Sequence, residues 1–268
     1  MLLLWGFLVS FLGAWWGYYN QALSGSGMVG AVLIGTLIAG FGGWLWFGIL
    51  LVFFVSSSLL SGFRRKDKQE VEQDFAKTGR RDIGQVLANG GLGALLAVLN
   101  TRLEPSLFLF VGYVGVMAAV TADTWATELG VLSKGTTLSI LNGQKVAPGT
   151  SGGVSLWGTL AGASGAILIG LVAEVGQKLT GPIGLTVGIL LMAGLIGGMA
   201  GCFMDSLLGA TLQIRYRCRV CGRITEKLKH CHQLTIRAGG WKWINNDWVN
   251  LISSVVGGLV ATAVVTWK

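Results

Sequence analysis

The stretch ADTWATELG places two carboxylates, Asp123 and Glu128, directly after an apolar segment. Carboxylates beside apolar surface are costly unless they pair with basic groups or coordinate a metal. Hard oxygen ligands suit Mg²⁺, which proteins usually hold with one or two carboxylates together with substrate phosphates. We therefore predict that Asp123 and Glu128 bind Mg²⁺. The alternative is a polar helix end whose acids pair with Lys134.

Two further acids lie at the ends of apolar segments. Asp205 occurs in GCFMDSLLGA, and Asp247 occurs in NNDWVN. Each is a candidate Mg²⁺ ligand or, alternatively, a helix cap. Asp247 can cap the helix that begins there, because an aspartate at that position accepts hydrogen bonds from free backbone N–H groups. Asn250, one turn later, is expected to face the interior of the helical bundle.

A glycine-rich turn with hydroxyl groups, KVAPGTSGGVS, precedes another apolar segment. Backbone N–H groups at the start of a helix point outward and favour negative charge. The spacing is not that of the Walker A motif. We predict a phosphate-binding turn, with an ordinary turn as the alternative. The candidate residues are Lys145, Gly149, Thr150, Ser151, Gly152 and Gly153.

Basic residues cluster in the segment KTGRRD, just before a further apolar segment. Arg80 and Arg81 could each bind a phosphate group through paired hydrogen bonds. The alternative is charge that only sets the orientation of the chain in a membrane. Ser58 and Asn89, on either side of this segment, are polar candidates for nucleotide binding. The run Arg64–Lys68 is interpreted as orientation-setting charge on a solvated loop.

Three cysteines and a histidine have the spacing of a small metal site. Cys218-x-x-Cys221 is followed by His230 and Cys231. This ligand set is typical of structural Zn²⁺. Free thiols are the alternative, and a catalytic role for the zinc is not expected. Cys202, within an apolar segment, is interpreted as a small packing residue.

The elements that position these residues are apolar and long. Charged residues make up 12% of the 268 residues and hydrophobic residues 52%, which excludes a disordered chain. The 43 glycines suit helices that approach closely in lipid. We predict an all-α polytopic membrane protein with about eight transmembrane helices in a single domain, 1–268. The predicted spans are 2–20, 27–43, 44–61, 86–103, 106–122, 155–177, 182–205 and 248–267.

The charges are segregated along the chain. Seventeen of the 20 basic residues lie in three segments, 62–85, 123–154 and 206–247. The positive-inside rule places these loops in the cytoplasm and both termini outside. This pattern accounts for the net charge of +8 without nucleic-acid binding. Most acidic residues share the same face, which favours a membrane enzyme with a cytoplasmic active site over a transporter.

The motifs together resemble one integral-membrane family. They are ADTWATELG, PGTSGGVS, DSLLGATLQ, CxxC…HC, NNDWVN and GRRDIGQVLANGG. The resemblance as a whole runs from about residue 56 to residue 258. The family includes the phytyl-phosphate kinase of tocopherol (vitamin E) and phylloquinone synthesis. It is more distantly similar to CTP-dependent phytol and dolichol kinases and to CDP-diacylglycerol synthases.

The resemblance implies a kinase that transfers a phosphoryl group from CTP, or another nucleoside triphosphate, to phytyl phosphate. It also implies Mg²⁺ and the plasma or thylakoid-type membrane of a cyanobacterium-like bacterium. The catalytic candidates are then Asp123, Glu128, Lys145, Arg80 and Arg81. The alternatives are a cytidylyltransferase that makes a CDP-lipid and a lipid transporter or flippase. Whether the chain forms a homodimer is left open.

Overall fold

The computed structural model describes residues 1–72, 75–77, 79–103, 106–132, 135–180 and 187–267. Lys134, the predicted alternative partner of Asp123 and Glu128, lies outside these residues. Eight described helices are long and apolar enough to cross a membrane, which confirms the predicted fold class. They are α1 (Leu2–Tyr19), α2 with its π-helical end (Gly25–Gly42), α3 (Trp44–Gly62), α5 (Ile83–Arg102), α6 (Leu107–Gly130), α7 (Leu156–Thr180), α8 (Ile189–Thr211) and α9 (Asn246–Thr266).

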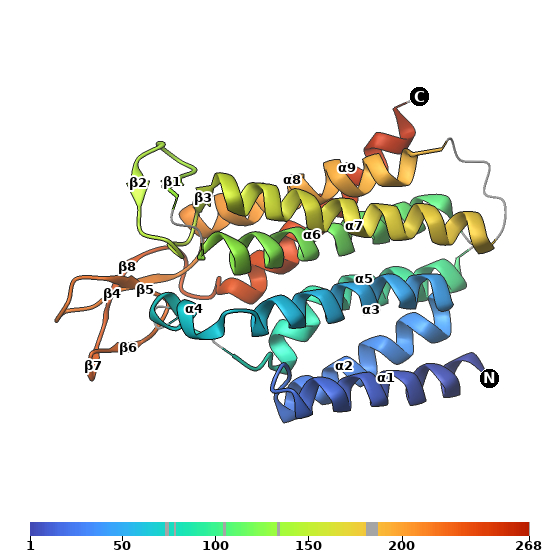
Figure 1. Cartoon of the computed structure of the whole chain (residues 1–268), viewed down its shortest axis with the longest axis horizontal. Helices are drawn as coiled ribbons and strands as arrows, with labels where there is room; N and C mark the ends of the chain where they lie inside the picture. The colour runs from blue at the N-terminus through green and yellow to red at the C-terminus, as the bar shows by residue number, and fades with distance from the viewer. Residues whose placement is uncertain (73–74, 78, 104–105, 133–134, 181–186, 268) are drawn as a thin grey trace.

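The long helices lie side by side, and the polar segments gather at one end of the bundle (Figure 1). This end, named the loop end here, carries the short helix α4 (Arg65–Glu72) and all the described strands. Both termini lie at the opposite end. The described parts of the segments 62–85, 123–154 and 206–247 therefore meet at this end.

The loops contain short strands, which the sequence patterns do not predict. One antiparallel sheet has the order β2-β1-β3 and a second has the order β5-β4-β8, while β6 pairs with β7. The strands are β1 (Thr137–Ser139), β2 (Lys145–Val146), β3 (Gly153–Ser155), β4 (Arg215–Arg217), β5 (Ile224–Thr225), β6 (Lys229–His230), β7 (Gln233–Leu234) and β8 (Ile236–Gly239). Runs this short carry little hydrophobic periodicity, so no pattern indicates them.

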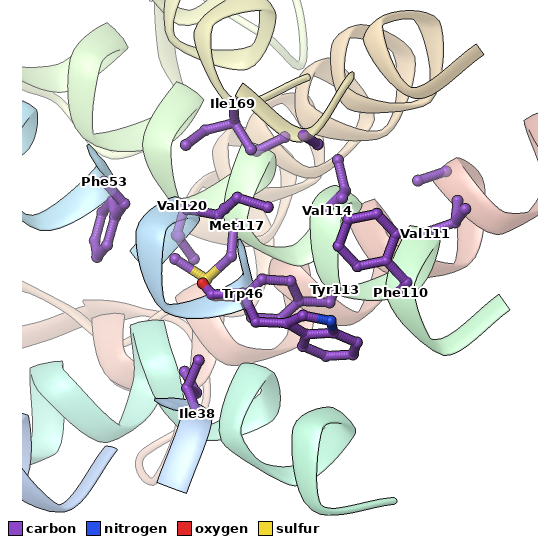
Figure 2. Packing of buried hydrophobic residues seen from close by; sticks show 14 of the residues in the cluster. Ile38, Trp46, Phe53, Phe110, Val111, Tyr113, Val114, Met117, Val120 and Ile169 are labelled. Carbon is purple, nitrogen blue, oxygen red and sulfur yellow. The ribbon is translucent and has the colours of Figure 1, made fainter. Parts of the chain in front are cut away.

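Helix α6 is the centre of the bundle. It packs against α3, α5, α7, α8 and α9, and residues 110–122 are buried without interruption. A helix that is apolar on every face belongs in such a central position. Figure 2 shows Tyr113 of α6 against Trp46 of α3: their rings stack with centroids 4.5 Å apart, and the Tyr113 hydroxyl donates to the Trp46 carbonyl at 2.7 Å.

Glycines allow α6, α8 and α9 to approach closely. A β-carbon on Gly257 of α9 would lie 3.0 Å from the carbonyl oxygens of both Gly115 on α6 and Gly197 on α8. Side chains at this crossing would force the three helices apart. The glycine content therefore serves the close backbone packing that association in lipid favours.

Three helix ends differ from the predicted spans. Helix α6 continues to Gly130, so Asp123 and Glu128 lie in its last two turns. Helix α8 continues to Thr211, so Asp205 lies inside it. Asn245, and not Asp247, caps α9 by accepting the N–H of Trp248 at 3.2 Å. The carboxylate of Asp247 is thereby free for other contacts.

Candidate active site

A cavity of about 340 Å³ lies at the loop end. It is lined by the loop-end termini of α3, α5, α6, α7, α8 and α9, by α4 and by described residues of the loops that follow α4, α6 and α8. Its lining holds both signs of charge, as expected for a site that binds phosphate groups and a cation. The acids are Asp123, Glu128, Asp205, Glu226 and Asp247, and the described bases are Lys68, Lys77 and Arg81.

Asp123 and Asp205 face the cavity from neighbouring helices, α6 and α8. Both side chains line the cavity, and neither forms an ion pair with a described residue. Oδ2 of Asp205 is buried and accepts no hydrogen bond from the described part of the chain. Two adjacent acids without a countercharge suit a divalent cation. No three of the described acids gather around one point, so a cation held by this pair would need further ligands such as water or phosphate oxygens.

Glu128 already has a basic partner. Lys68 of α4 is 1% exposed, and its Nζ lies 2.5 Å from Oε2 of Glu128 and donates to the carbonyl of Leu60 at 2.6 Å. Ser61 also donates to Glu128. The interpretation of Lys68 as solvated, orientation-setting charge is therefore wrong. A Mg²⁺ ion would have to compete with Lys68 for the carboxylate of Glu128. The role of Glu128 as a Mg²⁺ ligand stays a prediction.

Lys77 joins the starts of α5 and α9. Its Nζ lies 2.5 Å from Asp247 and 2.9 Å from Asp82, the N-cap residue of α5. Burial disfavours the charged form of Lys77, but these two carboxylates outweigh it and raise the pKa of Lys77 above its ordinary value. Burial likewise opposes ionisation of Asp82, yet the Gln85 N–H and Lys77 lower its pKa. Oδ1 of Asp247 stays buried without a hydrogen-bond partner among the described residues.

The glycine-rich turn lines the cavity from Gly149 to Gly153. The Thr150 hydroxyl donates to Ala147 at 2.7 Å, and the Gly153 N–H donates to the Thr150 carbonyl at 2.7 Å. Gly152 has a φ of 81°, and a β-carbon there would lie 2.9 Å from the Ser206 carbonyl and would clash with Ala210 on α8. The sequence predicts that this turn lies directly at the start of a helix. This prediction is wrong, because β3 separates the turn from α7.

Three predicted site residues lie outside the described lining of this cavity. Lys145 is exposed on β2, and Arg80 is exposed with its guanidinium 5.9 Å from the ring of Tyr18. Ser58 lies in α3, where its buried hydroxyl has no hydrogen-bond partner in the described chain. By contrast, Arg81 lines the cavity. Asn89 also lines it and accepts a hydrogen bond from Asn250 at 3.3 Å.

Glu226 is a site residue that the sequence does not predict. Its carboxylate accepts hydrogen bonds from Gln213 at 2.5 Å, from the Ser151 hydroxyl at 3.2 Å and from the Ala76 N–H at 3.2 Å. Burial raises the pKa of Glu226, and these hydrogen bonds partly offset the effect. In the sequence it lies in a charged run, RITEKLKH, which gives no signal of burial.

A second cavity, of about 70 Å³, lies beside the first. It lies between α1, α2, α3 and α5 and is lined mainly by apolar side chains such as Ile34, Phe47 and Phe54. Arg81, Gln85 and Asn89 line both cavities, so these three residues form the boundary between them. A polar and an apolar compartment that share one wall suit a molecule with a charged head and an apolar tail.

The four predicted zinc ligands lie together, outside the described lining of both cavities. The thiols of Cys218, Cys221 and Cys231 and the ring of His230 converge in the loops between β4 and β7. They come from two turns that are nine residues apart in the sequence, so the sheet topology brings them together. Cys202 lies apart from them in α8, where it lines the larger cavity.

The family described as integral membrane protein DUF92 matches residues 8–258. The chain belongs to this family. Its relatives include an uncharacterized membrane protein of Methanocaldococcus jannaschii, 31% identical over 91% of this chain and 87% of the relative. Protein PGR of Arabidopsis thaliana is 30% identical over 94% and 92%, and Protein VTE6, chloroplastic, of the same plant is 26% identical over 89% and 64%. No solved structure matches the chain.

Proposed function

We propose that this protein is a membrane phosphotransferase that converts an isoprenoid monophosphate to the diphosphate. The observation that carries the proposal is the pair of cavities that share Arg81, Gln85 and Asn89. The donor is a nucleoside triphosphate, with CTP and phytyl phosphate as the first substrates to test, because the motifs resemble the family of the phytyl-phosphate kinase.

The acceptor lies across the boundary between the cavities. Its phosphate group accepts hydrogen bonds from Arg81 and Gln85, and the first carbons of its tail enter the apolar cavity. The rest of the tail lies among lipids, because the apolar cavity is too small for a long isoprenoid. The donor phosphates lie against the turn from Thr150 to Gly153, on the side of Asp123 and Asp205.

The chemistry is a displacement at the terminal phosphorus of the donor. A phosphate oxygen of the acceptor forms a bond to the γ-phosphorus, the bond to the bridging oxygen breaks, and the nucleoside diphosphate leaves. The acceptor is already an anion, so no strong base is required. Bound Mg²⁺, held by Asp123 and Asp205, would neutralise phosphate charge. Arg81 supplies further positive charge, while Lys68 and Lys77 neutralise the neighbouring carboxylates of Glu128 and Asp247. Catalysis is then positioning and charge neutralisation.

Labelled CTP tests the reaction. Purified protein is incubated with phytyl phosphate and Mg²⁺ and with CTP that carries the label in either the α- or the γ-phosphate. Transfer of the γ-label to the lipid supports the proposal. Transfer of the α-label instead identifies a cytidylyltransferase, and transfer of neither label from CTP, UTP or ATP contradicts a phosphotransferase.

Variants of the two unpaired acids test the site. We expect Asp123→Asn and Asp205→Asn to lower turnover about 100-fold or more, the usual scale for loss of an electrostatic contact to the reacting phosphates. Asp67→Asn is the matched control, because Asp67 is exposed on α4 and pairs with Arg64 at 2.8 Å. Equal turnover of Asp123→Asn, Asp205→Asn and wild type would show that the reaction takes place elsewhere.

The proposal includes the orientation of the site. The loop end carries most of the basic residues, so we place it in the cytoplasm, where nucleoside triphosphates are available. A plasma or thylakoid-type membrane suits this arrangement.

A further inference from the structure

The loops between β4 and β7 hold a cluster of four metal-ligating side chains. The ligand atoms of Cys218, Cys221, His230 and Cys231 all lie within 4.8 Å of one another. Nδ1 of His230 lies 3.5 Å from the Cys221 sulfur and 3.2 Å from the Cys231 sulfur. In tetrahedral zinc sites, bonds of about 2.0–2.3 Å place neighbouring ligand atoms about 3.5–3.8 Å apart. The two distances to Nδ1 are close to this spacing, and the whole cluster is compact enough for one ion to contact all four ligands.

The first two ligands lie on a tight turn between β4 and β5. The Cys218 N–H donates to the Arg223 carbonyl at 2.9 Å, and the Gly222 N–H donates back to the Cys218 carbonyl at 3.1 Å. The Val220 N–H donates to the Cys218 sulfur at 3.3 Å. Backbone donation to sulfur stabilises a thiolate, which is the form that binds metal. This turn directs both sulfurs to the same side.

The other two ligands belong to the hairpin that pairs β6 with β7. His230 is the last residue of β6, and Cys231 and His232 form the two-residue turn that follows it. Their neighbours pair directly, and the φ angles of Cys231 and His232 are 48° and 60°. Positive φ at both central residues is the backbone of a type I′ turn, the common two-residue hairpin connection. The hairpin thus presents Nδ1 of His230 to the sulfurs of both Cys221 and Cys231.

We propose that Cys218, Cys221, His230 and Cys231 bind one structural Zn²⁺ ion that fastens the β4–β5 turn to the β6–β7 turn. The segment between these ligands contains Glu226, which contacts Gln213, Ser151 and Ala76 at the edge of the larger cavity. The metal thus fixes both ends of the segment that carries Glu226 to the cavity. The inference does not depend on the reaction proposed above.

Metal analysis of the purified full-length protein tests the site. We expect about one zinc per chain in wild type and at least a tenfold loss in Cys221→Ser and in Cys231→Ser. Two matched controls should keep their zinc: Cys202→Ser, whose thiol lies in α8, and His232→Asn, since asparagine tolerates a positive φ. Wild type without zinc, or equal loss in the controls, would overturn the proposal, and so would a disulfide between Cys221 and Cys231.

Two measurements on the wild-type chain remain informative if the variants do not fold. Replacement of zinc by Co²⁺ should give the intense visible absorption of a tetrahedral thiolate site. Removal of the metal by a chelator should speed hydrogen exchange in residues 215–239 and leave α6 unchanged. An octahedral cobalt spectrum, or exchange that does not respond to chelation, rejects the site. These readouts need no substrate, so they can fail or succeed independently of the kinase assay.

Discussion

Lys68 shows how the environment of one residue decides its role. It lies in a run of charged residues on α4, yet it is buried and pairs with Glu128 at the wall of the larger cavity. Substitution of one partner of such an ion pair is strongly destabilising, because the remaining charge is left without a partner in a partly dehydrated environment. The pair therefore contributes to both the stability and the charge balance of the site.

We expect Lys68→Met to destabilise the protein by about 3 kcal/mol. The double variant Lys68→Met/Glu128→Gln should lose less than the sum of the single variants, because it leaves no unpaired charge. Thermal melting in detergent measures both effects. Lys66→Met, an exposed lysine of the same helix, is the control and should melt like wild type. Additive losses would show that Lys68 and Glu128 do not interact.

The contacts of Lys77 predict that its ion pairs stabilise the folded protein equally over a wide range of pH. The raised pKa means that the stabilisation from charged Lys77 is complete below its ordinary value of 10.5 and is lost only as pH rises through a higher folded value. The lowered pKa of Asp82 means that its contribution is complete above 3.8 and is lost as pH falls through a lower folded value.

The difference in melting temperature between wild type and Lys77→Met should therefore stay constant between about pH 5 and about pH 9. Melting curves across this range measure it. A difference that changes within the range would mean that Lys77 or its partners titrate there, which contradicts the raised pKa of Lys77 and the lowered pKa of Asp82.

At the scale of elements, the contact between the glycine-rich turn and α8 decides the shape of the larger cavity. Gly152 combines a positive φ with a close approach to Ala210, whereas Gly143 has a φ of 68° and no neighbouring atom within 4 Å of the place where a β-carbon would lie. A substitution at Gly143 therefore tests backbone strain alone, whereas a substitution at Gly152 tests strain together with steric crowding. Strain alone costs about 1–2 kcal/mol for an alanine in the left-handed region.

We expect Gly143→Ala to lose only the stability that backbone strain costs and to bind nucleotide with unchanged affinity. Gly152→Ala should lose more stability and weaken nucleotide binding, because the turn must move away from α8. Melting in detergent and nucleotide titration measure the two effects. If both variants behave alike, the approach of the turn to α8 does not shape the binding site.

At the scale of the whole molecule, the eight helices place both termini at the end opposite the loops. With the loop end in the cytoplasm, the termini lie outside. A fusion of alkaline phosphatase to the C-terminus should therefore be active, and a green fluorescent protein fusion at the same position should be dark. Phosphatase inserted at Asn142, in the β1–β2 connection, should be inactive. The reverse pattern would invert the orientation and place the cavity away from cytoplasmic nucleotides.

The sequence alone determines the class of fold and the family. Low charge, long apolar segments and many glycines leave a bundle of membrane helices as the solution, because only structures that satisfy their own backbone hydrogen bonds cross lipid. The acids at helix ends and the glycine-rich turn are also predictable as candidates, since ADTWATELG, PGTSGGVS and NNDWVN are local signals. The apolar segments predict eight spans, and eight such helices are described.

Only the tertiary structure decides which polar groups share a cavity. Lys68, Lys77 and Glu226 lie in charged runs that are indistinguishable from solvated loops, and Lys145 and Arg80 look equally suited to bind phosphate. Their burial in the structure distinguishes the two groups. Packing between distant segments brings Lys68, Lys77 and Glu226 into the lining of the larger cavity, whereas Lys145 and Arg80 remain exposed. The same packing places an apolar cavity beside Arg81, where no sequence motif predicts it. Burial depends on contacts between residues far apart in the chain, and local patterns do not record those contacts.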